Sequence, residues 1–140
     1  MKVRSTGEYY GKKGSELRLN GIVVSEYDYV VDSTEWHYHE NPYLMFVLKG
    51  QLNDNNKKGT LPCTSGTLLF HNWQEAHYNQ KFSREARGFH CEFDQNFLSI
   101  FSDYILPQEG SFELQHPDYH LLISQILYEF RSDGQFAQVS

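Results

Sequence analysis

The histidine pair in Trp36-His37-Tyr38-His39-Glu40 is the feature of the sequence best suited to chemistry. Side chains at positions i and i+2 of a β-strand point to the same face, so we expect the imidazoles of His37 and His39 to project together. Two imidazoles on one face can chelate a divalent metal ion if further ligands arrive from other strands. The alternative is a pair of hydrogen-bonded histidines on the wall of a sheet, and both interpretations are open at this point.

Other polar side chains could join this pair. His90 and Glu92 share one face of a predicted strand, so either of them could supply a further ligand; the alternative is a buried, hydrogen-bonded His90. The same two interpretations apply to His71. His116 and His120 fall in a predicted helix, where a solvated or capping role is the default.

Composition and charge exclude several classes of function. Lys and Arg total 12 against 18 Asp and Glu, which gives a net charge of −6, whereas nucleic-acid-binding surfaces are usually basic. The 140 residues correspond to one domain. Cys63 and Cys91 cannot form a disulfide framework or a thiolate metal site, so they indicate free thiols in a reducing compartment. No run approaches the roughly 20 apolar residues of a membrane span, and we expect a cytoplasmic protein.

Short β-branched and aromatic runs, separated by turn residues, predict the elements that position the histidines. The candidate strands are 22–31, 36–39, 43–48, 66–71, 76–82 and 87–93. The polar run Asn-Asp-Asn-Asn at residues 53–56 is expected to be one of the turns between them. Six or more short strands indicate an antiparallel sandwich or barrel. Residues 1–20 are rich in Gly, Lys, Ser and Glu and are expected to form an irregular N-terminal arm.

A helical period replaces the strand period after Phe93. Asp94 is a candidate N-cap for a first amphipathic helix that runs to Pro107. Its apolar stripe comprises Phe97, Leu98, Phe101, Tyr104 and Ile105. A second helix opens at His116-Pro117 and is expected to end at Asp133-Gly134. Its stripe comprises Tyr119, Leu122, Ile123, Ile126, Leu127 and Phe130. We expect both stripes to pack against the barrel, with a partner surface on part of the second as the alternative.

Two spaced motifs run through the strand-rich part: His37-x-His39-x3-Tyr43-x6-Gly50 and Pro62-x3-Gly66-x10-His77. Residues 21–93 thereby resemble the cupin superfamily. The resemblance implies a double-stranded β-helix (jelly-roll) barrel, with His37, His39 and His77 as ligands of a divalent metal such as Zn, Ni or Fe. Tyr43 stands where the family has a glutamate. A neutral phenol is a weaker ligand for a hard ion, so no metal cofactor is certain.

A narrower resemblance rests on residues 36–43, residues 66–77 and the two predicted helices. Together they resemble the effector-binding domain of AraC-type transcriptional regulators, in which the metal glutamate is often absent. This implies a small-molecule effector in the barrel pocket, with Tyr43, His71 and His90 as ligand-binding residues. It also implies a homodimer through residues 94–140, no catalysis, no membrane contact and DNA binding only through a domain downstream of Ser140.

The competing interpretation is a small metal-dependent cupin enzyme, an oxygenase or isomerase with a histidine-rich centre. Such an enzyme needs a fourth hard ligand, which Tyr43 does not readily supply, and an acid or base that neither motif provides. It also leaves the two C-terminal helices unexplained. The sequence therefore favours the sensor over the enzyme, with the chain as a fragment of a longer regulator.

Overall fold

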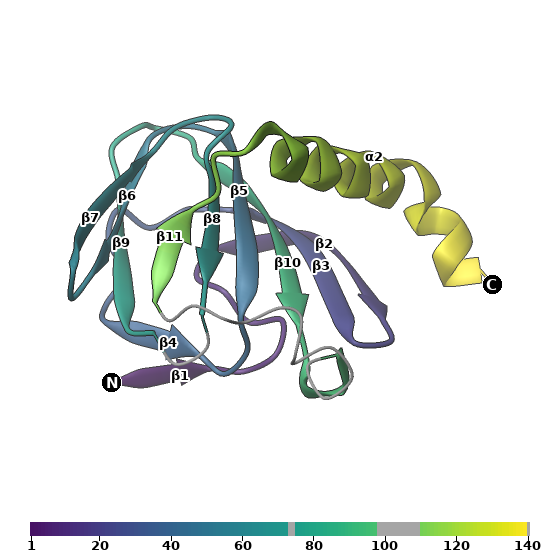
Figure 1. Ribbon diagram of the computed structural model, residues 1–140, viewed down its shortest axis with the longest axis horizontal. Helices are drawn as coiled ribbons and strands as arrows, with labels where there is room; N and C mark the ends of the chain where they lie inside the picture. Colours follow the sequence, from purple (N-terminus) through teal and green to yellow (C-terminus); the bar gives the residue numbers. More distant parts are fainter. Residues whose placement is uncertain (73–74, 98–109, 140) are drawn as a thin grey trace.

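The chain folds into two facing β-sheets, with one long helix outside them (Figure 1). The computed structural model describes residues 1–72, 75–97 and 110–139. The order of the five-stranded sheet is β1 (Lys2–Arg4), β4 (His37–His39), β9 (His77–Lys81), β6 (Leu52–Asn56) and β7 (Gly59–Cys63). The order of the six-stranded sheet is β11 (Ser111–Glu113), β8 (Leu68–His71), β5 (Tyr43–Lys49), β10 (Arg87–Phe93), β3 (Ile22–Asp28) and β2 (Lys12–Leu19). The predicted mainly β jelly-roll fold class is confirmed.

Alternation along β5 separates two apolar clusters on opposite faces of the six-stranded sheet. Tyr43, Met45 and Val47 point into the space between the sheets and belong to the inner core. Leu44 and Phe46 point outward, toward the cluster beneath the helix. Because successive strand residues face opposite ways, this one strand supports both the barrel interior and the packing of the helix.

The six predicted strands are all present, as β3, β4, β5, β8, β9 and β10, but the prediction of a turn at residues 53–56 is wrong. These residues belong to β6, which pairs antiparallel with β7 on one side and with β9 on the other. Asn and Asp usually disfavour strands because their side chains compete for backbone hydrogen bonds. Here pairing from both sides and a buried partner for Asp54 outweigh that preference. Strands β7 and β11 are also absent from the prediction.

The prediction of an irregular N-terminal arm is also wrong for residues 2–4 and 12–19, which form strands β1 and β2. β1 runs parallel to β4, with Lys2 opposite His37. β2 pairs with β3 at the edge of the larger sheet and carries an exposed charged side chain at Lys12, a pattern that blunts a sheet edge. Between the two strands the chain turns inward and buries Tyr9 in the inner core.

The predicted helix from Asp94 to Pro107 lies largely outside the described residues. Its start is seen, because residues 95–97 are helical and Asp94 Oδ1 accepts hydrogen bonds from the backbone N–H groups of Asn96 and Phe97. The second helix, α2 (Pro117–Val139), begins where the sequence predicts. It does not end at residues 133–134, because one glycine costs a helix only about 1 kcal/mol and does not by itself terminate it.

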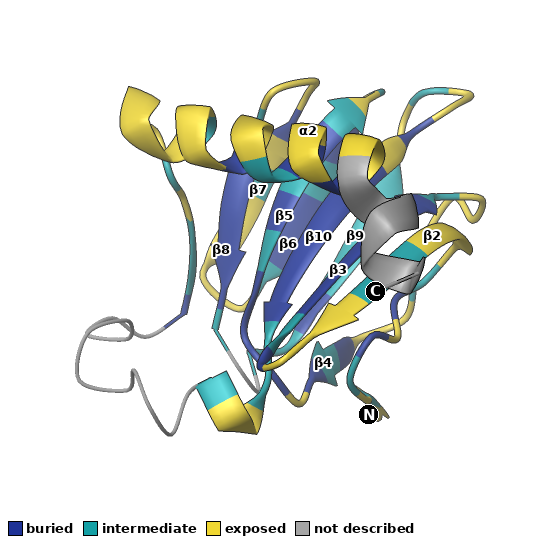
Figure 2. Cartoon of the chain, turned by 90° about the vertical axis from the view of Figure 1, so that its right-hand side faces the viewer, coloured by how far each residue is buried: buried dark blue, intermediate teal, exposed yellow. Residues whose placement is uncertain are grey.

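Helix α2 crosses the outer face of the six-stranded sheet, as Figure 2 shows. Ile123, Leu127 and Phe130 are buried there, so the predicted stripe does pack against the barrel, whereas Tyr119 and Leu122 on the same stripe are exposed. Neither α2 nor any other helix in the described part of the chain is long and apolar enough to cross a membrane.

Candidate metal and ligand site

Strand pairing brings three histidines together inside the barrel. His37 and His39 point to the same side of β4, and the antiparallel pairing of β4 with β9 sets His37 opposite His77. One ligand nitrogen from each ring can be chosen so that all three lie within 4.8 Å of one another. The side chains are almost wholly buried, with relative exposures of 1% for His37, 4% for His39 and 2% for His77. The structure therefore gathers the three predicted metal ligands at one point.

Hydrogen bonds orient two of these rings. The Nδ1–H group of His37 donates to the backbone carbonyl of Glu35 at 2.8 Å, and the Nδ1–H group of His77 donates to Asp54 Oδ1 at 2.7 Å. In both rings the Nε2 lone pair is thus left for another partner. Histidines that ligate metals characteristically donate their second ring N–H to a carbonyl or carboxylate in this way.

Electrostatics keep the cluster in the protonation state that a metal requires. Burial, reinforced by the proximity of His77, lowers the pKa of His37 to about 4. The same two effects, with His37 as a further neighbour, hold the pKa of His39 well below its ordinary value. Both rings are therefore neutral near pH 7, and neutral imidazole is the form that coordinates zinc, nickel or iron.

Tyr43 occupies the fourth position of the cluster as a neutral phenol. Burial is the main cause that raises its pKa well above the ordinary value, so it does not supply an anionic oxygen near pH 7. Its hydroxyl lies 3.3 Å from His77 Nε2 and donates to that nitrogen, since Nδ1 carries the proton. The donor set of three imidazole nitrogens and a phenol fits a borderline ion such as zinc or nickel, which would act at this place as a Lewis acid.

His90 and Glu92 do not join the cluster as further ligands. The Tyr29 hydroxyl donates to His90 Nε2 at 2.6 Å, because burial lowers the pKa of His90 to about 3 and leaves it neutral. Glu92 is buried and accepts hydrogen bonds from the Gly7 N–H at 2.9 Å and from the Tyr9 hydroxyl at 3.0 Å. Both groups therefore position the N-terminal segment and the aromatic wall of the barrel.

Asp54 is a residue of the candidate site that the sequence pattern does not predict. Its carboxylate is fully buried and accepts hydrogen bonds from His77 Nδ1 and Asn79 Nδ2, each at 2.7 Å. Burial alone would raise the pKa of Asp54, but the imidazoles of His71 and His77 together with these hydrogen bonds hold it below its ordinary value. The available signal was the apolar Leu52 two residues earlier, which marks the inward face of a strand.

The cavity beside the cluster is small, with a volume of about 40 Å³. Tyr43 and His90 line it, together with Tyr9 and Tyr10 from the N-terminal segment. His71 lies behind Tyr43 instead, with ring centroids 4.7 Å apart. Of the three predicted ligand-binding residues, two therefore face the cavity. The space is much smaller than small-molecule pockets, which usually measure about 300–1,000 Å³.

The two-sheet arrangement is similar to several solved structures, among them two described as cupins. A cupin-2 domain containing protein from Shewanella frigidimarina NCIMB 400 matches with a TM-score of 0.53 and 14% identity, over 62% of this chain and 84% of that one. A cupin 2 conserved barrel domain protein from Salinispora arenicola CNS-205 matches with a TM-score of 0.53 and 12% identity, over 65% and 82% respectively. KdgF from a Halomonas species matches with a TM-score of 0.50 and 9% identity, over 55% and 73%.

Comparison of the amino-acid sequence with known families and proteins identifies no relative. No protein-family model matches the chain, and no curated protein sequence matches it either. The likeness in structure and the placement of the two motifs agree on the architecture. The chain folds as a jelly-roll β-barrel like those of the matched cupin structures, with a C-terminal helix packed on its outer face.

Proposed function

We propose that this barrel binds a small molecule beside its histidine cluster and serves in the cytoplasm as the sensing and dimerisation domain of an AraC-type transcriptional regulator, without catalysis. The observation that supports this role best is the position of Tyr9. The N-terminal segment places this ring inside the barrel, against the groups that a ligand would meet. A ligand and the segment would then compete for one space.

The contacts of Tyr9 show how the segment and the cluster are linked. Its ring centroid lies 4.8 Å from that of His39, 5.0 Å from that of Tyr43 and 3.9 Å from that of His90. Its hydroxyl donates to Glu92 at 3.0 Å. Because the remaining cavity measures about 40 Å³, a ligand of ordinary size requires this ring to leave. Ligand binding would thus be reported by the N-terminal segment, by a shift between two arrangements.

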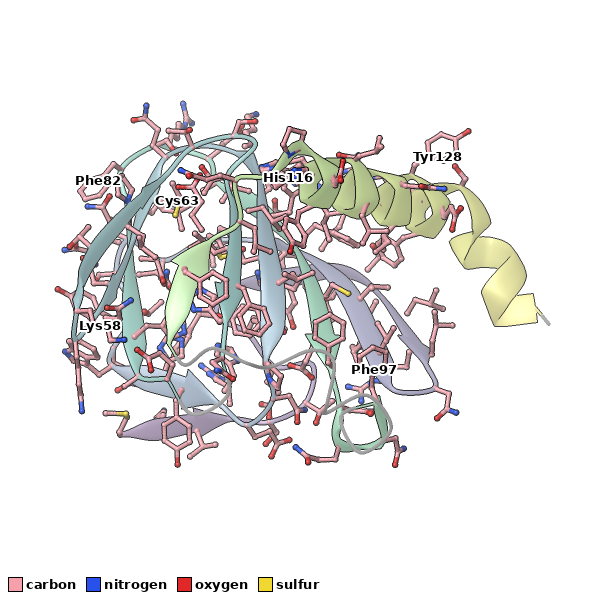
Figure 3. The ribbon with its side chains drawn as sticks, viewed as in Figure 1. Lys58, Cys63, Phe82, Phe97, His116 and Tyr128 are labelled. Carbon is pink, nitrogen blue, oxygen red and sulfur yellow. The ribbon has the colours of Figure 1, made fainter. Side chains whose placement is uncertain are left out.

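The outer side of α2 supports the dimerisation part of the proposal. Leu121 and Tyr128, seven residues apart and therefore on one face of the helix, are exposed, and Figure 3 shows Tyr128 pointing away from the barrel. Large apolar side chains gathered on one exposed helix face are typical of a protein contact. A second copy of the chain is the partner expected here, as in the regulators that the sequence resembles.

The test uses the whole chain and its variant Tyr9→Ala, with Phe82→Ala, which removes an exposed aromatic ring, as a matched control. A panel of sugars and aromatic acids is screened by thermal shift, and cleavage within residues 1–11 is followed by limited proteolysis. We expect a ligand to raise the melting temperature and to change the cleavage of the segment, and Tyr9→Ala to bind that ligand more tightly. A ligand that leaves the segment unchanged, or binds Tyr9→Ala no better, contradicts the proposal.

A metal-dependent cupin enzyme is the second candidate, and the orientation of the histidine rings favours it. His37 and His77 present Nε2 lone pairs beside His39, which is an arrangement ready for zinc, nickel or iron. Metal analysis of the purified chain separates the candidates. Stoichiometric iron or nickel would favour the enzyme, whereas a metal-free dimer stabilised by a small molecule would favour the sensor.

A further inference from the structure

Beside the pocket histidines, one carboxylate oxygen of Asp54 and one ring nitrogen of His71 face each other without a hydrogen bond. Asp54 Oδ2 and His71 Nε2 lie 3.4 Å apart, and their side chains are 0% and 1% exposed. Across the residues that the structure describes, neither atom has a hydrogen-bond partner. Buried polar atoms are nearly always paired, so two orphaned atoms that face each other indicate a missing group between them.

The hydrogen bond of His71 Nδ1 indicates which kind of group could lie between Asp54 and His71. His71 Nδ1 lies 2.9 Å from the hydroxyl oxygen of Ser111 on β11. When Nδ1–H donates to this oxygen, the Nε2 lone pair points toward the Asp54 carboxylate. Two electron-rich atoms at 3.4 Å with side chains buried from solvent repel each other, and a cation between them turns that repulsion into attraction.

We propose that Asp54, His71 and His77 form a second divalent-cation site, suited to zinc and distinct from the trio of His37, His39 and His77. One ligand atom from each of the three can be chosen so that all lie within 4.8 Å of one another. Two ligands of a tetrahedral zinc ion with bonds of about 2.0–2.1 Å lie roughly 3.3 Å apart, which the Asp54–His71 separation matches. This second site includes a carboxylate, which is a harder ligand than the phenol that Tyr43 places beside His37, His39 and His77.

The two sites share His77, so one chain holds one ion at a time. An ion in the pocket needs the Nε2 lone pair of His77, with the proton on Nδ1 donated to Asp54. An ion at the second site needs the Nδ1 lone pair, and the proton then sits on Nε2, where the Tyr43 oxygen, 3.3 Å away, can accept it. The tautomer of this one ring selects the site, and the proposal holds whether or not the barrel senses a small molecule.

The test measures Zn²⁺ affinity and stoichiometry, and the visible spectrum with Co²⁺, on the full chain and on matched variants. The double variant His37→Ala/His39→Ala removes two of the three pocket ligands, and we expect it still to bind one ion per chain. Adding His71→Phe to it should weaken Zn²⁺ binding by roughly tenfold or more and remove the tetrahedral Co²⁺ spectrum. The control His116→Ala, at the exposed start of α2, should change neither (Figure 3).

A folded double variant that binds no Zn²⁺ overturns the proposal, and so does an added His71→Phe substitution without effect. Circular dichroism reports whether each variant folds. If the double variant does not, anomalous scattering at the zinc edge on crystals of the unmodified chain decides instead. A peak beside Asp54 and His71 supports the site, and a peak among the pocket histidines only, or no peak, overturns it.

Discussion

Acid should destabilise this protein through histidines that are buried in the neutral form. Burial is the main cause that lowers the pKa of His71 to about 4 and that of His90 to about 3, whereas an unfolded histidine titrates near 6.5. As the pH falls below 6.5, the unfolded chain takes up protons that the folded chain does not. The stability that these groups contribute is therefore complete above that pH and is lost as the pH approaches the folded values.

The size of the effect follows from these pKa values. Between pH 7 and pH 5, each of the two histidines lowers the free energy of unfolding by about 2 kcal/mol, so the pair lowers it by about 4 kcal/mol. That is a large part of the ~5–15 kcal/mol by which a domain is usually stable. Urea unfolding followed by circular dichroism at half-unit steps of pH measures the loss directly.

Two variants attribute the loss to its source. His90→Gln keeps an acceptor for the Tyr29 hydroxyl but does not titrate, so it should reduce the loss between pH 7 and pH 5 by about 2 kcal/mol. His116→Gln, which changes an exposed histidine at the start of α2, is the matched control. A stability that is constant from pH 7 to pH 5 in the unmodified chain, or an equal slope in all three proteins, would refute the reasoning.

Three further substitutions test the packing and the site. In Gly88→Ala, the new Cβ would lie 2.6 Å from Tyr29 Cζ, so the ring must move and we expect a loss of about 3 kcal/mol in urea unfolding; a loss below ~1 kcal/mol would contradict this close approach. Arg131→Met removes the two hydrogen bonds to Glu26 that hold α2 against β3, and should lower stability by about 1 kcal/mol, because the arginine is half exposed. Tyr43→Glu adds a carboxylate beside the pocket histidines and should tighten Zn²⁺ binding about tenfold in a chelator competition, whereas unchanged affinity would mean that residue 43 does not face the ion.

Much of the fold could be predicted because its strands obey a local rule. The continuous apolar run of β5 and the alternation of apolar and polar residues in β10 both indicate strands, because a short apolar run is typical of a strand buried on both faces and a period of two is typical of any strand. The polar β6 shows neither pattern, and its composition predicts a turn. It is a strand because β7 and β9 satisfy its backbone from both sides, and neither pairing is visible within the segment itself. The inward turn that buries Tyr9 depends in the same way on distant partners.

The candidate site also combines features that the sequence predicts with features that depend on the tertiary structure. The sequence by itself determined that His37 and His39 share one face, because the period of a strand is two. The cupin motif added His77, but only the tertiary structure set it opposite His37 and placed Asp54 behind it. The protonation of these groups was also decided there, because burial and hydrogen bonding, and not residue type, set the pKa of an imidazole or a carboxylate. The local geometry of a strand depends on neighbouring residues in the sequence. The surroundings of a buried charge depend on strands that come together only in the folded chain.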